Sequence, residues 1–340
     1  MTVHDLVGIP VGPVDFAPQL RGALAPGDEA TARADTALFE RLCEDYLAPE
    51  DLIGSPLRRA SSAPEYDVAD LRPAEAGAFL ADQERARLGL GDAPVADILD
   101  LLDSEVGLRV FVHRLASPRV AGMYAYTVRL GGCVLINGSH PRVRQAWTAA
   151  HEYAHYLTTR TSAQVLRLEG AKRRRRAEHV ADAFARSFLM PPSSVRRRFL
   201  RTVRARAGFV VSDLLAMAGC YGVSAQAMSL CLEELGLVSR GTWDQLAKDG
   251  FRPSEVAREV GYPTGHAPRL RLPARYEALA VYAYEAGLIT ESRLAELLRC
   301  SRVEAREKAA KLAESVDVDE SGTTQARNFD LTRTLVLART

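Results

Sequence analysis

The chain of 340 residues is too long for one small hydrophobic core, which indicates two or three domains. Hydrophobic residues make up 47% of it and charged residues 26%, a balance typical of globular rather than disordered proteins. Its 44 lysines and arginines nearly balance 43 aspartates and glutamates, so the net charge of +1 excludes a global field that would draw the chain onto nucleic acid or membranes.

The five cysteines lie far apart and form no CxxC pair. This favours reduced, buried thiols over a disulfide framework or a cysteine zinc site. No apolar run is long enough to span a bilayer, and the first residues lack the charged and apolar regions of a signal peptide. We therefore expect a cytoplasmic protein with no membrane partner. The sequence carries no signal for an oligomeric state.

The N-terminal segment, residues 1–90, is predicted to hold an irregular lead-in followed by helices. The first 27 residues carry prolines and glycines outside any helical period. Apolar residues then recur at helical spacing from about residue 28 to residue 53, and another helix is predicted from Pro73 to about Leu88. A Ser- and Pro-rich connector, residues 54–72, separates the two helices.

Residues 91–192 change from a helical to a strand period. A helix is predicted within "APVADILDLLDSE", and "LRVFVHRL", "RVAGMYAYTVRL" and "GCVLIN" read as three short strands separated by turn signals. We expect these strands to form a small antiparallel sheet. A further helix follows directly, with Pro141 in its first turn.

Residues 193–312 are predicted to be almost entirely helical, with breaks near Gly208, Gly219–Gly222, Gly236–Gly241 and Gly261–Pro268. Residues 313–340 contain β-branched residues but cannot be assigned to strands or to a loosely held tail. The fold class predicted is α+β, with a mainly helical C-terminal domain.

The helix after the last strand carries the stretch "TAAHEYAHYLTTR", which contains an HExxH pattern. His151 and His155 are four residues apart, so on a helix they present two imidazoles to one metal ion. Glu152 is rotated by roughly 100° and projects beside that ion, where it can deprotonate a water. The alternative, two ordinary histidines that happen to have this spacing, is not excluded by the motif alone.

A second helical stretch, "RAEHVADAFARSFLMPP", offers further ligands. Glu178 can complete a His₂Glu set, which leaves a fourth zinc position open for catalysis. Asp182 lies four residues later on the same face and can accept a hydrogen bond from the spare N–H of a ligand histidine. The alternative for Glu178 is a solvated helix carboxylate. His179 points away from this face and is expected to be a surface residue.

These two stretches resemble the ImmA/IrrE family of bacterial zinc metallopeptidases over roughly residues 85 to 195. Asp182 departs from the family pattern, which usually has Asn there, and the first 80 residues carry little of the resemblance. The positions that match are Asn137, Arg144, Thr148, His151, Glu152, His155, Glu178, Ala181, Phe184, Ala185, Leu189, Met190 and Pro191.

The resemblance implies a zincin-like core and an endopeptidase that cleaves a helix-turn-helix transcriptional repressor, in a stress response or in control of a mobile element. It implies Zn²⁺ as the cofactor, with Mn²⁺ as a substitute in vitro. The spacing by itself gives only metal-dependent hydrolysis with Glu152 as general base. Two alternatives stay open: a DNA-binding regulator with a vestigial protease fold, and a scaffold that binds a repressor without cutting it.

Two helical pairs have the pattern of a helix-turn-helix. In the first, Ser224 caps a helix whose predicted exposed residues include two glutamates and no cation, which favours protein docking or a structural role over DNA. These residues are Gln226, Ser229, Glu233 and Glu234. The second pair offers cations interleaved with glutamates, typical of a solvated face, so we expect no specific DNA binding. These cations are Arg302, Arg306, Lys308 and Lys311.

The basic run from Lys172 to Arg176 is predicted to lie in the loop before the second ligand helix, because cations oppose the macrodipole at a helix N-terminus. Tyr156 is expected to serve in packing. A transition-state stabiliser is required in such a protease, and Tyr221 and His266 are candidates that nothing in the sequence distinguishes.

Overall fold

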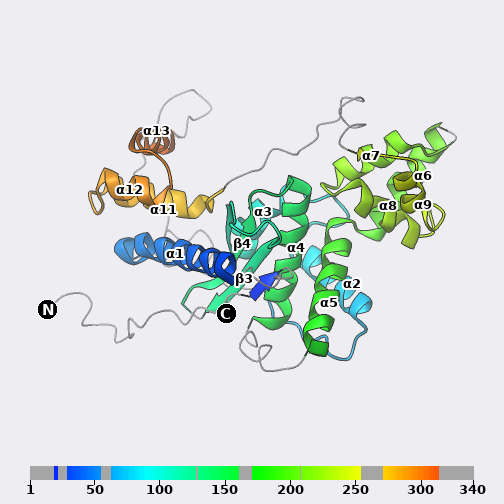
Figure 1. Cartoon of the computed structure of the whole chain (residues 1–340), viewed down its shortest axis with the longest axis horizontal. Coiled ribbons are helices and arrows are strands. Elements are labelled where there is room, and N and C mark those ends of the chain that lie inside the picture. Colours follow the sequence, from blue (N-terminus) through cyan, green and yellow to red (C-terminus); the bar gives the residue numbers. More distant parts are fainter. Residues whose placement is uncertain are drawn as a thin grey trace, which may run out of the picture. The chain divides into compact units, whose positions relative to one another are not determined.

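The computed structural model describes residues 19–21, 29–54, 63–127, 129–160, 171–206, 208–253 and 271–313, drawn as coloured ribbons in Figure 1. Contacts divide the chain into two compact units. Unit 1 comprises Met1–Leu47 and Pro56–Pro273, and unit 2 comprises Ala48–Ser55 and Ala274–Thr340. The domain boundaries predicted near residues 90, 192 and 312 stay predictions. The α+β class is confirmed.

Unit 1 contains a four-stranded sheet of order β1-β3-β4-β2. The three predicted strands are confirmed as β2 (Arg109–His113), β3 (Gly122–Thr127) and β4 (Gly131–Asn137). The fourth strand, β1 (Gln19–Arg21), pairs antiparallel with β3 and lies in the segment predicted to be irregular. A strand of three residues is too short for an alternating pattern to reveal it.

The prediction of an antiparallel sheet is wrong for one pair, because β2 runs parallel to β4. A tight turn joins β3 to β4 and makes that pair antiparallel. Residues 114–121 connect β2 to β3 and pass to the far side of β4, whose seven residues are all buried. The fully buried strand β4 therefore lies between β3 and β2, and the sheet contains both parallel and antiparallel pairs.

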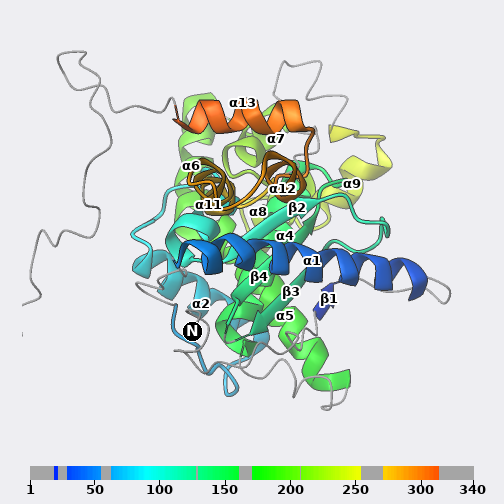
Figure 2. The same ribbon diagram turned by 90° about the vertical axis from the view of Figure 1, so that its left-hand side faces the viewer.

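Helices cover both faces of this sheet. α1 (Glu29–Ile53) crosses in front of β3 and β4 in Figure 2, and its Tyr46 contacts Phe111 of β2 edge to face with ring centroids 6.2 Å apart. The opposite face carries Val110, Tyr124 and Ile136, which belong to the main hydrophobic core with α4 (Arg142–Thr159). Alternate residues of each strand thus face different helices.

α2 (Pro73–Arg87) and α5 (Ala171–Leu189) form a further layer beside α4. α2 lies so close to α5 that a Cβ atom on Gly77 would approach the Cβ of Ala183 to 2.5 Å. Only glycine permits this approach at that position. The helices predicted over residues 28–53 and 73–88 are confirmed as α1 and α2.

The helix predicted within residues 93–105 begins later than its apolar pattern. Asp97 caps α3 (Ile98–Leu101) by accepting hydrogen bonds from the backbone N–H groups of Leu99 and Asp100 at 2.9 and 3.3 Å. A π-helical turn, Leu102–Val106, follows and ends at Gly107, whose φ of 76° suits glycine.

The helical region predicted after residue 193 continues in unit 1 as α6 (Pro192–Arg206), α7 (Val211–Cys220), α8 (Ala225–Glu234) and α9 (Thr242–Lys248). Ser224 caps α8 as predicted. Ser229 is buried rather than exposed, so that prediction is wrong. None of the described helices is by itself long and apolar enough to cross a membrane; α7 and α8 reach that composition only when taken together, across a bend of 102°.

Unit 2 combines the last turns of α1 with α11 (Ala274–Glu285), α12 (Glu291–Leu297) and α13 (Arg302–Ala313). Arg275 donates to Glu50 at 2.5 Å, and the hydroxyl of Tyr276 donates to the carbonyl of Leu297 at 2.8 Å. The predicted break at residues 261–268 and the unassigned stretch 314–340 lie outside the described residues.

Candidate metal centre

The HExxH pattern lies on α4, in a run of buried residues. His151 is 1% exposed and His155 is 4% exposed, and their Nε2 atoms are 3.2 Å apart. The spacing of four residues places both imidazoles on one face, one turn apart, as predicted. α4 packs against β3 and β4, so the sheet fixes the position of this face.

α5 brings Glu178 to the two histidines. Its Oε2 lies 3.2 Å from Nε2 of His151, and its Oε1 lies 3.5 Å from Nε2 of His155. One ligand atom from each residue lies within 4.8 Å of the others. The three residues predicted as metal ligands are therefore brought together by two helices that are far apart in sequence.

The donor set fits a divalent metal ion such as zinc. Two imidazole nitrogens and a carboxylate converge from one side, which is the three-ligand arrangement of catalytic zinc sites. Burial would raise the pKa of Glu178, but the adjacent imidazoles of His151 and His155 outweigh burial and lower that pKa well below the ordinary value. The carboxylate is thus held in the ionised form that metal binding requires.

Asp182 lies one turn after Glu178 on α5 and contacts the other nitrogen of His151. Its Oδ1 is 2.9 Å from Nδ1 of His151. When Nδ1 carries the proton and donates it to this carboxylate, Nε2 of His151 is the nitrogen that can bind a metal ion. The structure thus places Asp182 beside the ring nitrogen of His151 that faces away from Glu178.

Glu152 is 1% exposed, and its Oε1 has no hydrogen-bond partner among the described residues. A buried carboxylate oxygen without a partner is costly and is typical of a group reserved for a ligand or for chemistry. Gly122 of β3 lies against it: a Cβ atom there would be 3.4 Å from Glu152 Oε1. Sequence reasoning missed Gly122, because no local pattern connects it with α4.

Asn137 ends β4 and holds the loop between β2 and β3 against the sheet. Its Nδ2 donates to the carbonyls of Ser117 and Val120 at 3.2 and 2.8 Å, and its Oδ1 accepts from the N–H of Ser139 at 3.0 Å. The side chain is fully buried. The strand-ending Asn of the motif therefore has a structural role, because it fixes the entry into α4.

The basic run Lys172–Arg176 lies in the first turns of α5, so its predicted position in the preceding loop is wrong. Arg176 explains part of the difference. Its Nη2 donates to the backbone carbonyls of Val68 and Leu71, each at 2.6 Å. These partners offset the unfavourable position of a cation near a helix N-terminus. His179 is exposed, as predicted.

The tyrosines singled out from the sequence serve mainly in packing. Tyr156 is buried and contacts the rings of Tyr124, Tyr126 and Tyr153. The hydroxyl of Tyr221 is buried and lies 2.8 Å from Oγ of Ser194. In the part of the chain that the structure describes, no hydrogen bond joins Tyr221 to the ligand cluster, and His266 lies outside that part.

Comparison with known proteins places the ligand cluster inside a recognised domain. Residues 103–232 match the family Peptidase_M78, described as the IrrE N-terminal-like domain. This match confirms the resemblance to the ImmA/IrrE family that the motifs indicate. A search of curated proteins finds no match to the chain.

Proposed function

Because residues 103–232 match the IrrE N-terminal-like domain of peptidases, we propose that this protein is a zinc-dependent endopeptidase with a zincin-like core. The observation that carries the proposal is the convergence of His151, His155 and Glu178 beside the buried carboxylate of Glu152. The family further suggests a helix-turn-helix transcriptional repressor as substrate, whose cleavage would relieve repression in a stress response or in control of a mobile element.

Each residue of the centre has a distinct role in this proposal. His151, His155 and Glu178 hold the ion, which is Zn²⁺ in the active enzyme and can be replaced by Mn²⁺ in vitro. A bound zinc ion supplies Lewis acidity, which polarises the scissile carbonyl and lowers the pKa of water. Asp182 fixes the tautomer and orientation of His151.

Glu152 carries the proton transfers. Its carboxylate accepts a proton from the water that attacks the carbonyl carbon, and then delivers that proton to the nitrogen of the leaving amine as the C–N bond breaks. Burial of Glu152 against β3 keeps the carboxylate out of bulk water. One residue thus serves as base and then as acid, and hydrolysis needs no further proton donor.

The test uses the purified chain, zinc or manganese, and a helix-turn-helix repressor encoded by a neighbouring gene, which is the substrate that the family suggests. The wild type should cut the repressor, whereas Glu152→Gln should cut at least about 100-fold more slowly while keeping its metal and its melting temperature. Equal cleavage by both proteins would remove Glu152 as general base. If both proteins bind the repressor and neither cuts it, the chain is a scaffold instead.

A further inference from the structure

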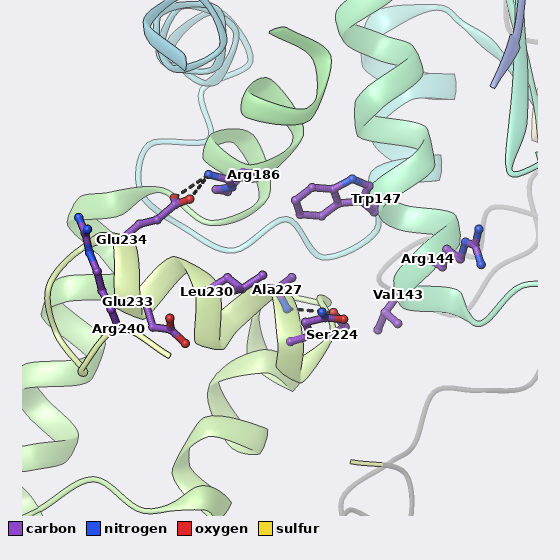
Figure 3. A pocket seen from close by; sticks show the side chains of 11 residues that line it. Val143, Arg144, Trp147, Arg186, Ser224, Ala227, Leu230, Glu233, Glu234 and Arg240 are labelled. Carbon is purple, nitrogen blue, oxygen red and sulfur yellow. Dashed lines mark hydrogen bonds and ion pairs between the residues drawn. The ribbon is translucent and has the colours of Figure 1, made fainter. Parts of the chain in front are cut away.

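A cavity of about 620 Å³ lies between α4, α5 and α8 of unit 1, and Figure 3 shows the side chains that line it. Its apolar part is formed by Val143 and Trp147 of α4 and by Ala227 and Leu230 of α8. Leu230 is 43% exposed although its neighbours on α8 are largely buried. The volume lies in the range of about 300–1,000 Å³ that ligand sites occupy, so it accommodates several residues of a peptide.

The cavity lies along the same helix faces as the metal ligands. Trp147 precedes His151 by four residues on α4, and Arg186 follows Asp182 by four residues on α5. Residues four apart on a helix lie on one face, one turn from each other. The cavity therefore begins about one turn away from the metal centre, at a position that a peptide bound there can reach.

The acidic side chains of the cavity are already bound to other groups of the protein. Glu234 accepts from Nη1 of Arg186 at 2.6 Å (Figure 3). Glu233 accepts from the backbone N–H groups of Gly241 and Trp243, both at 2.8 Å, at the start of α9. Both carboxylates are therefore already partnered by groups of the protein.

Two arginines that line the cavity have no charged partner within the described part of the chain. Arg144 and Arg240 line the cavity, are exposed, and form no ion pair with any residue in the described part of the chain. Their charges act on an occupant at short range, where screening by salt is weakest. An apolar cavity whose lining includes two exposed, unpaired arginines is complementary to an apolar peptide segment with acidic flanks.

We propose that this cavity is a recognition subsite for the peptide substrate. It takes a large apolar side chain between Trp147 and Leu230, and Arg144 and Arg240 bind acidic residues beside that side chain. The inference rests on the proposed endopeptidase function. It also gives the α7–α8 pair a role: α8 turns Ala227 and Leu230 toward the protease helices, so the pair docks substrate rather than DNA (Figure 3).

Binding is tested with two fluorescently labelled peptides in the metal-loaded Glu152→Gln variant, so that no cleavage intervenes. One peptide has a Leu-Phe-Leu centre flanked by pairs of glutamates, and the other has the same centre flanked by lysines. The acidic peptide should bind at least about tenfold more tightly at physiological salt. Adding Arg144→Glu together with Arg240→Glu should remove or reverse that preference.

Leu230→Ser should weaken binding of the acidic peptide about tenfold, because it removes an apolar contact of the cavity. The matched controls are Leu200→Ser and Arg201→Glu on α6, which change an exposed leucine and an exposed arginine that do not line the cavity. Equal binding of the two peptides, or equal losses in Leu230→Ser and Leu200→Ser, would overturn the subsite. Failure of repressor cleavage by the wild type would instead count against the proposed function.

Discussion

Gly122 of β3 lies against α4, the helix that carries Glu152. The backbone at residue 122 is so close to α4 that any side chain larger than that of glycine would clash with it. A Cβ atom on Gly122 would lie 2.6 Å from Cγ2 of Thr148 and 3.4 Å from Oε1 of Glu152. Thr148 is buried, and its β-branched side chain has few alternative rotamers. The absence of a side chain at residue 122 therefore sets the distance between the sheet and the proposed general base.

We expect Gly122→Ala to lower the free energy of unfolding by about 1–3 kcal/mol, which is the cost of overpacking a well-filled core. It should also reduce kcat, because α4 must shift and Glu152 moves with it. Thermal melting and repressor cleavage measure the two effects. Gly208→Ala is the control, since a Cβ atom there meets nothing within 4 Å. Identical melting temperatures for the two variants would show that the close approach is unimportant.

The metal content of the purified protein should depend on His151, His155 and Glu178, and not on the adjacent His179. We expect about one zinc per chain, lost on treatment with a chelator and largely absent from His151→Ala and Glu178→Ala. His179→Ala should keep its zinc, because His179 is exposed and does not belong to the cluster. Elemental analysis of the purified proteins measures this directly. Equal zinc in Glu178→Ala and the wild type would exclude Glu178 as a ligand.

Asp182 should tune metal affinity without being a ligand. Asp182→Ala removes the acceptor 2.9 Å from Nδ1 of His151, and we expect metal to bind about 10- to 100-fold more weakly. Asp182→Asn keeps an acceptor oxygen and should lose less. Competition with a chelating dye gives the two affinities. An Asp182→Ala variant with wild-type affinity would mean that the hydrogen bond does not orient His151.

The ligand cluster was predictable because its geometry is local to two helices. Spacings of four residues put His151 with His155, and Glu178 with Asp182, on single faces whatever the rest of the fold. The same rule would have found Trp147 and Arg186, which extend these faces by one turn into the cavity. Trp147 and Arg186 belong to neither motif, so sequence patterns alone did not identify them as candidates.

Features that depend on distant segments were not predictable in this way. The parallel pairing of β2 with β4 follows from where the chain crosses, which strand periodicity does not encode. The burial of Ser229 depends on how α8 packs in unit 1, and its sequence neighbours do not reveal it. The helical position of Arg176 depends on carbonyl groups more than one hundred residues earlier, at Val68 and Leu71.

Glu84 of α2 should be essential for the stability of α4, the helix that carries two of the three proposed metal ligands. It is fully buried and accepts hydrogen bonds from the hydroxyls of Tyr66 and Tyr153 and from Arg87, whose Nη2 lies at 2.7 Å. Burial raises the pKa of the Tyr153 hydroxyl, and the adjacent Glu84 carboxylate raises it further. The tyrosine therefore stays a neutral donor to this carboxylate.

We expect Glu84→Ala to lower the free energy of unfolding by about 3 kcal/mol, because it leaves a partly buried arginine and two hydroxyls without their acceptor. Glu84→Gln should lose less, since an acceptor oxygen remains. Glu75→Gln, on the exposed side of the same helix, is the matched control and should hardly change the melting temperature. Denaturant titration of the three variants measures their free energies of unfolding and so ranks their stabilities. Equal stability of Glu84→Ala and Glu75→Gln would contradict it.

Specific DNA binding by the chain is the remaining alternative, and the contacts of both helical pairs argue against it. In α8, Ser229 is buried and Glu233 caps α9, so neither is available to read a base. In unit 2, Nε of Arg302 and Nε of Arg306 lie 2.7 and 3.1 Å from the same carboxylate, that of Glu291. These cations are partly neutralised within the unit before any phosphate approaches.

We therefore expect no sequence-specific complex with the promoter region of its own gene. Any weak binding should fall steeply between 50 and about 200 mM salt, because phosphate contacts release counterions. Gel shifts with specific and scrambled DNA at two salt concentrations measure this. A nanomolar, sequence-specific complex at physiological salt that Arg302→Ala together with Arg306→Ala abolishes would reverse the conclusion. If the double variant Arg302→Ala and Arg306→Ala lost that complex and Leu230→Ser kept it, DNA reading would be assigned to α13 of unit 2. The α8 helix would then remain the docking site for the substrate, because α8 itself carries no cation that could contact phosphate.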